Sequence, residues 1–192
     1  DFVDVDSDKW RQYAERKRWP LSWLYRRESQ TLLQFERKAA MMFDASLFVS
    51  PEEAALFRRL VPEAAGSISH LENGVDHRFF TPERDYADPY AGRREMLVFT
   101  GAMDYWANID AVRWFAREIF PRVRAAVETA EFAIVGARPS SEVQALSSLP
   151  GVMVTGAVRD IRPYLAHARV AIAPLRIARG IQNKVLEAMA MA

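Results

Sequence analysis

The chain has 192 residues, half of them hydrophobic, so it is long enough for one ordinary domain or two small ones with a buried core. Its 26 lysines and arginines nearly balance its 25 aspartates and glutamates, and this balance gives no overall attraction to nucleic acid or to an anionic membrane. The lack of cysteine excludes disulfides and thiolate metal sites, a composition that fits a cytosolic protein.

The first 76 residues are predicted to contain short strands and helices in alternation. The strands, which have β-branched or alternating apolar side chains, are expected at residues 1–6, 44–50 and 67–71. The helical segments are expected to be a turn capped by Ser7, a long helix from Pro20 to about Phe43, and a helix from Ser50 to about Leu60. The last of these has the plainest start signal, because serine is a preferred N-cap and Pro51 suits the first helical position.

Residues 77–95 are predicted to be a linker between two domains. Apolar periodicity is lost here, and Pro82, Pro89 and Gly92 stand among charged and tyrosine side chains. A turn signal at residues 72–76 comes directly before this segment. The pattern therefore divides the chain into a part that ends near residue 76 and a part that begins near residue 96.

From residue 96 onward, apolar strands alternate with helices. The strands are expected at residues 96–100, 131–135, 152–155 and 170–173. The helices that follow them are expected at residues 108–127, 140–148, 160–167 and 183–192. Strands that are apolar throughout are typical of a parallel sheet covered by helices on both faces, and the alternation predicts a doubly wound, Rossmann-like α/β layer. Ligands of such sheets bind at the carboxyl ends of the strands, so the loops after the strands are the candidate site.

Three of these loops begin with a glycine. For Gly136 and Gly156, a tight turn from strand to helix is an equally good explanation. Gly101 is more suggestive, because its loop brings a helix start near Asn108 to the end of a strand, and a helix N-terminus preceded by small residues attracts anions. The three-glycine spacing of dinucleotide-binding proteins is absent.

The last loop carries the most information. It contains Arg176, Arg179 and Gly180, and it leads into a helix that has Lys184 in its first turn. A lysine there opposes the helix dipole, and an anion bound between the two would explain its presence. Glu187 follows on the same helical face, so the alternative is a surface Lys–Glu pair worth roughly 0.2–0.5 kcal/mol.

The run from Gly180 to Ala190, GIQNKVLEAMA, resembles the donor-site motif of retaining glycosyltransferases of the two-domain GT-B type. Residues 98–101 followed by Asn108 resemble the first strand and loop of their C-terminal domain. Residues 73–76 followed by 80–82 resemble the segment that passes between their domains. The matches occur in the right order over nearly the whole chain, and in particular they resemble group 1, family 4 type sugar transferases of bacterial exopolysaccharide loci, including the exosortase-associated ones.

This resemblance implies an α/β fold with two Rossmann-like domains. Residues 1–76 would be the C-terminal part of an acceptor-side N-terminal domain, residues 77–95 the interdomain linker, and residues 96–192 a donor-binding domain that is incomplete at its C-terminus. The chain begins in a strand-like run and ends in a helical pattern, so we expect a fragment that is inactive by itself.

The resemblance also implies a donor-binding set. Lys184 would contact the donor diphosphate, Glu187 would hold the ribose hydroxyls, and Gly101 would let its loop approach the phosphates. Asn108, Arg179 and Gly180 complete the set, and the catalytic residues are not identified. The family usually has a second glutamate eight positions before the ribose glutamate, where this chain has Arg179, so a contact between this loop and the transferred sugar is in doubt.

The implied activity is that of a hexosyltransferase-type enzyme. It would transfer a sugar from a nucleotide diphosphate sugar to a saccharide or lipid-linked acceptor, with retention of configuration and without a metal or other cofactor. It would serve polysaccharide or glycolipid biosynthesis in the cytoplasm, with peripheral contact at the inner face of the membrane left open. Two alternatives stay open: a non-catalytic nucleotide- or phosphate-binding module, and a nucleotide-sugar epimerase of the same architecture.

Two further clusters have competing interpretations. Asp4, Asp6 and Asp8 spell Asp-x-Asp twice, a pattern that holds a divalent metal in another glycosyltransferase fold. A capped strand-to-helix turn, or an acceptor-side edge of the N-terminal domain, is favoured here. The basic residues 16–18 and 26–27 lie near three tryptophans, and this cluster is either a solvated face above core tryptophans or a membrane-surface patch, with nucleic acid the least favoured target. The three histidines lack the spacing of metal ligands.

Overall fold

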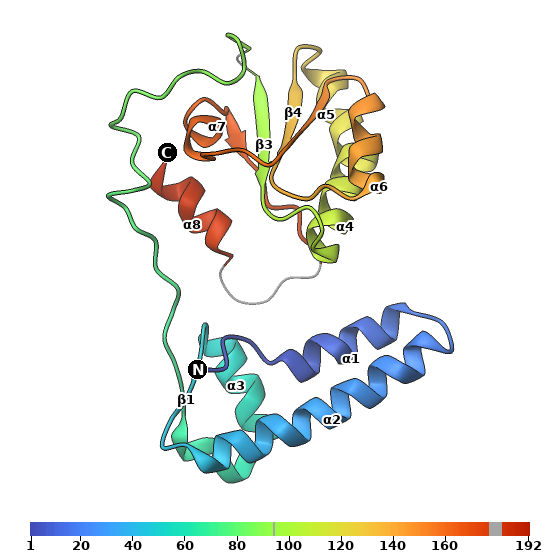
Figure 1. The fold of residues 1–192 in the computed structure, drawn as a ribbon, viewed down its shortest axis with the longest axis vertical. Coiled ribbons are helices and arrows are strands. Elements are labelled where there is room, and N and C mark those ends of the chain that lie inside the picture. The colour runs from blue at the N-terminus through green and yellow to red at the C-terminus, as the bar shows by residue number, and fades with distance from the viewer. Residues whose placement is uncertain (94, 177–181) are drawn as a thin grey trace. The chain divides into compact units, whose positions relative to one another are not determined.

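The structure of the chain is a computed structural model that describes residues 1–93, 95–176 and 182–192 (Figure 1). It divides into two compact units between Asn73 and Gly74. Among the described residues, the first unit contains 1–73 and the second contains 74–93, 95–176 and 182–192. The described residues include no helix with the length and apolar character needed to cross a membrane.

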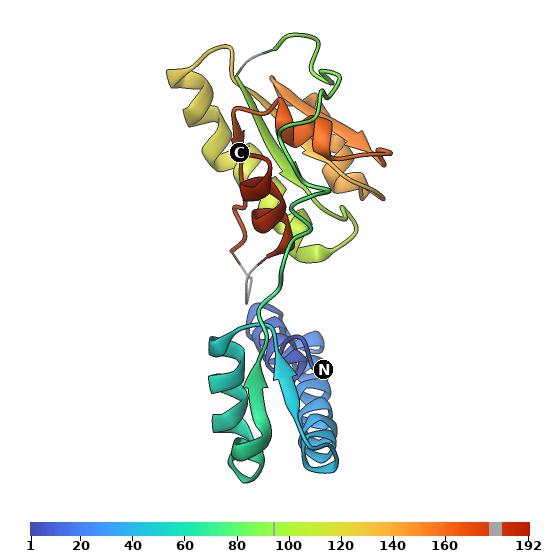
Figure 2. The ribbon, with the colours of Figure 1, turned by 90° about the vertical axis from the view of Figure 1, so that its left-hand side faces the viewer.

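The first unit is built on a two-stranded parallel sheet of β1 (Ser46–Phe48) and β2 (Ile68–His70), which Figure 2 shows side by side. The helices are α1 (Asp6–Arg16), α2 (Leu21–Met42), α3 (Pro51–Leu60) and a 3₁₀ segment, η1 (Pro62–Ser67). The predicted helix start at Ser50 is confirmed, because its hydroxyl accepts a hydrogen bond from the backbone N–H of Glu53 at 3.2 Å.

The strand predicted at residues 1–6 is wrong. Only Val3 forms a bridge, to Phe48, and α1 already begins at Asp6 without a side-chain cap from Ser7. Two buried glutamates explain the difference: the backbone N–H of Val5 donates to Glu53 at 2.7 Å, and the hydroxyl and N–H of Ser7 both donate to Glu36. Glu53 thus takes a backbone donor that a strand would have used, and the Ser7 hydroxyl donates to Glu36 in place of accepting as a cap does.

The second unit contains the predicted parallel sheet, which has four strands in the order β5-β4-β3-β6. The strands are β3 (Met96–Thr100), β4 (Glu131–Val135), β5 (Val152–Gly156) and β6 (Val170–Ala171). The helices are α4 (Trp106–Trp114), a π-helical turn η2 (Phe115–Ile119), α5 (Phe120–Ala126), α6 (Ser141–Gln144), a 3₁₀ turn η3 (Ala145–Ser148), α7 (Arg162–Ala166) and α8 (Asn183–Ala190). The single helix expected at residues 108–127 is thus a helical path with a π-turn in its middle.

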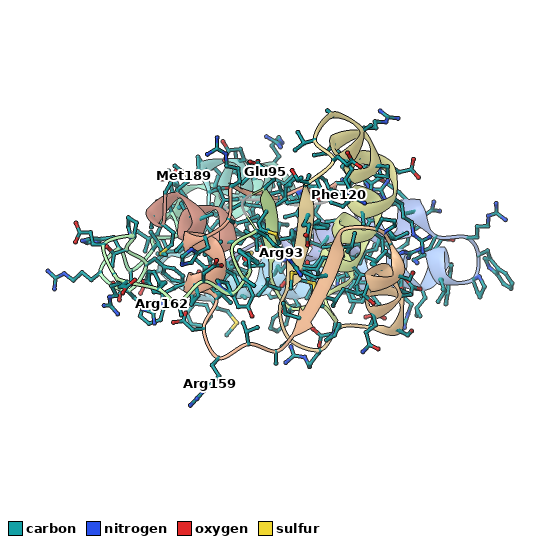
Figure 3. The ribbon with its side chains drawn as sticks, turned by 90° about the horizontal axis from the view of Figure 1, so that it is seen from above. Arg93, Glu95, Phe120, Arg159, Arg162 and Met189 are labelled. Carbon is teal, nitrogen blue, oxygen red and sulfur yellow. The ribbon has the colours of Figure 1, made fainter. Side chains whose placement is uncertain are left out.

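Helices cover both faces of this sheet because alternate strand residues point to opposite sides. Phe99 and Phe132 pack with α4 to α6, whereas Val98 and Ala133 pack with α7 and α8. Figure 3 looks down on this arrangement, with Phe120 and Met189 on opposite sides of the strands. The central strands β3 and β4 are therefore buried on both sides, whereas the edge strand β6 is exposed.

The segment predicted as a linker is attached to the second unit. Tyr90 is buried against this sheet, and its hydroxyl donates to the carbonyl of Tyr164 at 2.8 Å. The guanidinium of Arg162 lies 3.7 Å from the ring centroid of Phe79 and donates to the carbonyl of Phe79. The functional division into an acceptor-side and a donor-binding domain stays a prediction.

Candidate functional site

Gly101 follows directly after β3 and lies in a crowded place. A Cβ atom on this residue would lie 2.8 Å from Nδ2 of Asn108 and 3.2 Å from Nζ of Lys184. The Asn108 amide cannot easily give way, because its Nδ2 donates to the carbonyl of Ala102 at 2.9 Å. Glycine at this position therefore lets the loop, the asparagine and the lysine come together at the end of β3.

Gly136 supports this loop from the neighbouring strand end. A Cβ atom here would lie only 1.7 Å from the carbonyl oxygen of Gly101, a distance that no packing rearrangement of side chains could relieve. The N–H of Gly101 donates to the carbonyl of Val135 at 3.1 Å. Gly136 thus positions the Gly101 loop by close backbone contact. From the sequence, a tight turn was an equally good explanation for this glycine.

Lys184 lies in the first turn of α8, and its ammonium faces the end of β3 rather than bulk water. Its Nζ donates to Oδ1 of Asn108 at 2.8 Å and lies 4.1 Å from the ring centroid of Phe99. Burial lowers the pKa of Lys184 from 10.5 to about 8, against the opposing attraction of Glu187. The structure therefore brings together three residues of the predicted donor-binding set: Gly101 after β3, Asn108 in α4 and Lys184 in α8.

Glu187 lies one helical turn after Lys184 and is half-buried. Burial raises the pKa of its carboxyl, and the nearby Lys184 opposes that rise. The ion pairs among the described residues do not include one between these two side chains, since Lys184 bonds to Asn108 instead. A simple surface Lys–Glu pair is therefore not what this helix face contains.

Arg176, another cation of the last loop, lies outside this cluster. Arg176 forms a bidentate ion pair with Asp110 of α4, and its guanidinium lies 5.5 Å from the ring centroid of Trp114. Arg179 and Gly180, both predicted to bind the donor, lie outside the described residues, so their predicted roles stay predictions.

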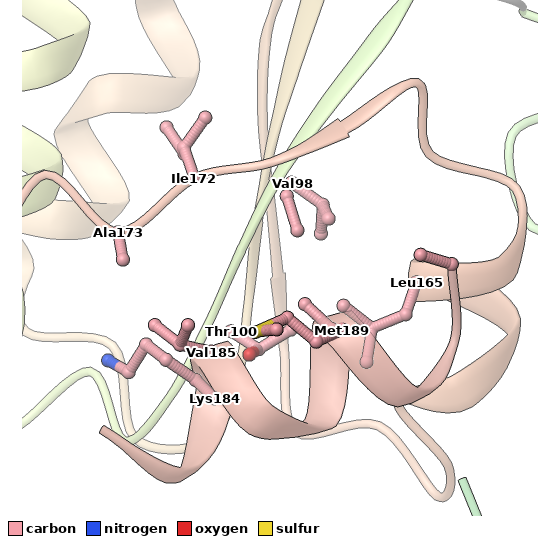
Figure 4. Close-up of a pocket in the computed structure, with 11 residues that line it drawn as sticks. Val98, Thr100, Leu165, Ile172, Ala173, Lys184, Val185 and Met189 are labelled. Atoms are coloured by element: carbon pink, nitrogen blue, oxygen red, sulfur yellow. The ribbon is translucent and has the colours of Figure 1, made fainter. Parts of the chain in front are cut away.

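A cavity of about 340 Å³ lies between α8 and the sheet, beside the Lys184 cluster (Figure 4). Its wall is mostly apolar, and the side chains that matter here are Val98, Thr100, Ile172, Lys184, Val185 and Met189. Thr100, which is 5% exposed, was not singled out from the sequence. Its signal was available, because it is a hydroxyl residue at the carboxyl end of an otherwise apolar strand.

The electrostatics of the cluster favour an anion. The N-terminus of α8 carries the positive end of the helix dipole, and the ammonium of Lys184 stands in the same turn. An ammonium has three N–H donors, of which Asn108 takes one. A phosphate or carboxylate oxygen bound there would offset the desolvation that lowers the lysine pKa.

The aspartates at the start of the chain are engaged elsewhere. Asp4 and Asp6 both pair with Lys9, at 2.7 and 2.9 Å, and Asp8 binds Arg11. In the part of the chain that the structure describes, no group of three histidine, aspartate or glutamate side chains is placed to hold a metal ion. Ion pairs therefore engage all three aspartates, and the side-chain cap predicted for this turn is not formed.

A family model for group 1 glycosyl transferases matches residues 94–192, just over half of the chain. Among solved structures, the chain is similar to Anabaena Alr3699/HepE in complex with UDP and glucose, with a TM-score of 0.61 and 14% identity over 85% of this chain and 46% of that chain. The same Anabaena protein in complex with UDP-glucose gives a TM-score of 0.60 at 14% identity, over 85% of this chain and 47% of that one.

A glycosyltransferase from Rickettsia africae ESF-5 is similar at a TM-score of 0.59 and 12% identity, over 84% of this chain and 46% of that chain. No curated protein matches the chain. At these identities the likeness shows the α/β fold, and this chain spans less than half the length of the solved structures that it matches.

Proposed function

Because this chain belongs to the group 1 glycosyl transferases, we propose that its second unit binds a nucleotide diphosphate sugar for transfer of the sugar to an acceptor. The observation that carries this proposal is the ammonium of Lys184, held by Asn108 beside Gly101 at the end of β3. A half-buried cation at a helix N-terminus suits the phosphates of such a donor.

Lys184 would act mainly on the leaving group. When the bond between the sugar and the diphosphate breaks, negative charge grows on the diphosphate oxygens. A preorganised cation in a partly desolvated site stabilises that charge more in the transition state than in the ground state. Glu187 would accept hydrogen bonds from the ribose hydroxyls, and the rise of about 1.5 Å per residue places it roughly 4.5 Å further along the helix axis.

The remaining features of the proposed reaction follow the family. The enzyme would transfer a hexose with retention of configuration, without a metal or other cofactor, to a saccharide or lipid-linked acceptor. The product would be a polysaccharide or glycolipid made in the cytoplasm. Arg179 would add positive charge near the diphosphate in place of a contact with the sugar. The Anabaena protein was solved with UDP and with UDP-glucose, which makes uridine diphosphate the first ligand to test.

The test is a calorimetric titration of UDP, GDP and ADP into the chain and into Lys184→Ala. A charge-assisted hydrogen bond contributes about 1.5–3 kcal/mol, so the variant should bind the preferred nucleotide about 10–100-fold more weakly. Lys38→Ala is the matched control, since Lys38 is an exposed lysine in the other unit. Equal affinity of the chain and Lys184→Ala would remove Lys184 from the site.

The reaction class is tested by incubating the preferred nucleotide sugar with the protein and an acceptor. Transfer of the sugar supports the proposal. A changed sugar without transfer would indicate an epimerase, and tight binding without turnover by the full-length protein would indicate a non-catalytic module. Retention is checked by the anomeric configuration of the first product.

A further inference from the structure

The turn between α1 and α2 has a composition unlike the rest of the chain. Residues 16–27 read RKRWPLSWLYRR, with five cations and no acid, whereas the whole chain has a net charge of only +1. The same twelve residues contain two tryptophans and two leucines. We call residues 16–27 the basic-aromatic tip.

The large apolar side chains of the tip point into solvent. Trp19 is 81% exposed and Trp23 is 61% exposed, and Leu21 and Leu24 are 46% and 39% exposed. Trp10 is different: its ring lies 5.7 Å from that of Tyr13 and 5.2 Å from that of Tyr25, between the two helices. The packing of α1 on α2 is therefore completed without Trp19 and Trp23, and exposed apolar groups of this size mark an interaction surface.

Four of the five cations of the tip have no ion-pair partner among the described residues. Arg16, Lys17, Arg18 and Arg26 are exposed, and none of them forms an ion pair with any described residue. Arg27 lies 3.6 Å from Glu28, a loose contact. By contrast Lys9 and Arg11, one or two turns earlier, are both held by aspartates. The tip therefore presents a concentrated positive charge around its tryptophans, and only Arg27 shares it with a carboxylate of the described residues.

The spacing along α2 joins these two features on one face. Trp23, Arg26 and Arg27 are related by three and four residues, so the ring and the two guanidiniums lie on the same side of the helix. Trp19 and Leu21 stand at the start of that helix. An aromatic ring with basic side chains one helical turn further along the chain is suited to a membrane–water interface. There the ring enters the headgroup layer and the cations contact lipid phosphates.

We infer that the basic-aromatic tip docks this protein on an anionic lipid surface. The two exposed indoles and the positive charge around them are complementary to an anionic headgroup layer, and this complementarity selects the occupant. Only the biological role of this docking, which is to bring the enzyme to a lipid-linked acceptor, rests on the proposed function. Lipid binding itself needs neither Lys184 nor a nucleotide.

The experiment is co-sedimentation of the chain with phosphatidylcholine vesicles that contain about one-third phosphatidylglycerol, compared with pure phosphatidylcholine vesicles. The chain should bind the anionic vesicles and lose binding as salt rises. Each cation replaced by glutamine in the tip should weaken binding by about fivefold. Trp19→Ser/Trp23→Ser should weaken it by roughly tenfold or more.

Two variants on the same helix serve as matched controls. Met42→Ser removes a side chain that is 79% exposed but lies at the far end of α2, and Lys38→Gln removes an exposed cation outside the tip. Both should bind the anionic vesicles as the unaltered chain does. Circular dichroism of every variant should show unchanged helix content, because the replaced side chains are exposed.

Fluorescence gives a second readout. Brominated lipids in the anionic vesicles should quench part of the tryptophan emission, and Trp19→Phe/Trp23→Phe should abolish that quenching although Trp10, Trp106 and Trp114 are still present. Quenching that persists in this variant would place the contact elsewhere and overturn the inference.

Three other results would also overturn it. The first is binding that is equal for both kinds of vesicle, or absent from both. The second is self-association of the chain, removed by Trp19→Ser/Trp23→Ser, without binding to vesicles. The third is binding of a single-stranded oligonucleotide through the tip without binding to vesicles. The outcome is separable from that of the donor site. Tip variants should keep the nucleotide affinity of the unaltered chain, and Lys184→Ala should keep its vesicle binding.

Discussion

Lys184 in the second unit and the cations of the basic-aromatic tip in the first unit stand in contrasting surroundings. The ammonium of Lys184 is half-buried between Phe99 and Asn108, and burial lowers its pKa to about 8. The tip cations are exposed, so they keep their hydration. The contrast teaches that a buried cation is held at an energetic cost which a bound anion can offset, whereas an exposed cation acts through its number and its neighbours.

The largest effect is expected from disrupting the backbone packing that places Lys184 at the end of β3. In Gly136→Ala the new Cβ would lie 1.7 Å from the backbone oxygen of Gly101, so one of the two strand-end loops must move. We expect the free energy of unfolding of the second unit to fall by about 3 kcal/mol and nucleotide affinity to fall with it. Chemical denaturation followed by circular dichroism measures the first effect and calorimetry the second.

Gly74→Ala is the control for this substitution. A Cβ atom at Gly74 has no neighbour within 4 Å, so its unfolding free energy should stay within about 0.5 kcal/mol of that of the unaltered chain. If Gly136→Ala proved as stable as Gly74→Ala, the close approach of the two loops would be wrong.

The next largest effect is expected in the pH dependence of the unfolding free energy, because Lys184 is buried and the tip cations are exposed. The pKa of Lys184 is about 8 in the folded chain and 10.5 when unperturbed, so between these values the unfolded chain binds more protons. The unfolding free energy should therefore rise as pH increases from about 8 to about 10.5, by about 1–3 kcal/mol from this group. The contribution is fully present above the upper value and is lost as pH falls through the lower one.

Lys184→Met isolates this contribution. Methionine keeps an apolar stem of similar length without a titrating group, so the pH-dependent rise should be absent from the variant. The difference between the two unfolding curves removes other groups that titrate in the same range, including Tyr90, whose pKa burial raises. Parallel curves for the two proteins between pH 8 and 10.5 would contradict a buried ammonium.

Nucleotide binding should act on the same lysine. A bound diphosphate favours the charged form, so UDP binding at about pH 9 should take up protons in the unaltered chain and none in Lys184→Met. Calorimetry in two buffers with different ionisation enthalpies measures the number of protons. Affinity in the unaltered chain should decline as pH rises above about 8, and a flat profile there would show that the charge of Lys184 does not serve the ligand.

How far the sequence predicts this site can be judged from particular residues. The strands that end at Thr100 and Val135 were predicted correctly, because continuous apolar runs leave only a buried parallel sheet as an interpretation. Lys184 was singled out because a cation at a helix start conflicts with the dipole. Its bond to Asn108 could not be predicted, because the two residues are 76 positions apart in the sequence. They meet only because β6, which precedes α8, pairs with β3, which precedes α4.

The misses have the same physical origin. The 1–6 segment has the alternation of a strand, but the carboxylate of Glu53 in α3 takes the backbone N–H of Val5. The carboxylate of Glu36 in α2 takes the N–H of Ser7, where α1 has already begun. Gly136 reads locally as a turn glycine, and its contact with Gly101 exists only once two strands are paired. Local pattern therefore determined the elements, while the partners of buried polar groups and the close backbone contacts required the folded structure.

The role proposed for Glu187 gives a smaller effect. Glu187→Gln replaces a charged acceptor of ribose hydrogen bonds by a neutral one, and nucleotide affinity should fall by about 3–10-fold, which is about 0.7–1.4 kcal/mol. The same variant should lose most of the preference for UDP over its 2′,3′-dideoxy analogue. A preference that is unchanged in Glu187→Gln would show that this carboxylate does not contact the ribose.

The smallest effects come from two exposed arginines, and they compare the two units directly. Arg176→Gln breaks the exposed ion pair with Asp110, and Arg18→Gln removes a tip cation that forms no ion pair with the residues that the structure describes. Surface charges of this kind contribute little to folding, so each variant should change the unfolding free energy by less than about 0.5 kcal/mol.

Binding separates these two arginines even though stability does not. Arg18→Gln should weaken binding to anionic vesicles by about fivefold, while Arg176→Gln leaves it unchanged, because only Arg18 stands beside exposed tryptophans. Neither variant should alter UDP affinity by more than about twofold, since Arg176 is already held by Asp110 and Arg18 belongs to the other unit. A large loss of UDP affinity in Arg176→Gln would mean that this arginine leaves Asp110 for the phosphates, and the donor site would then have to extend across the loop to α4.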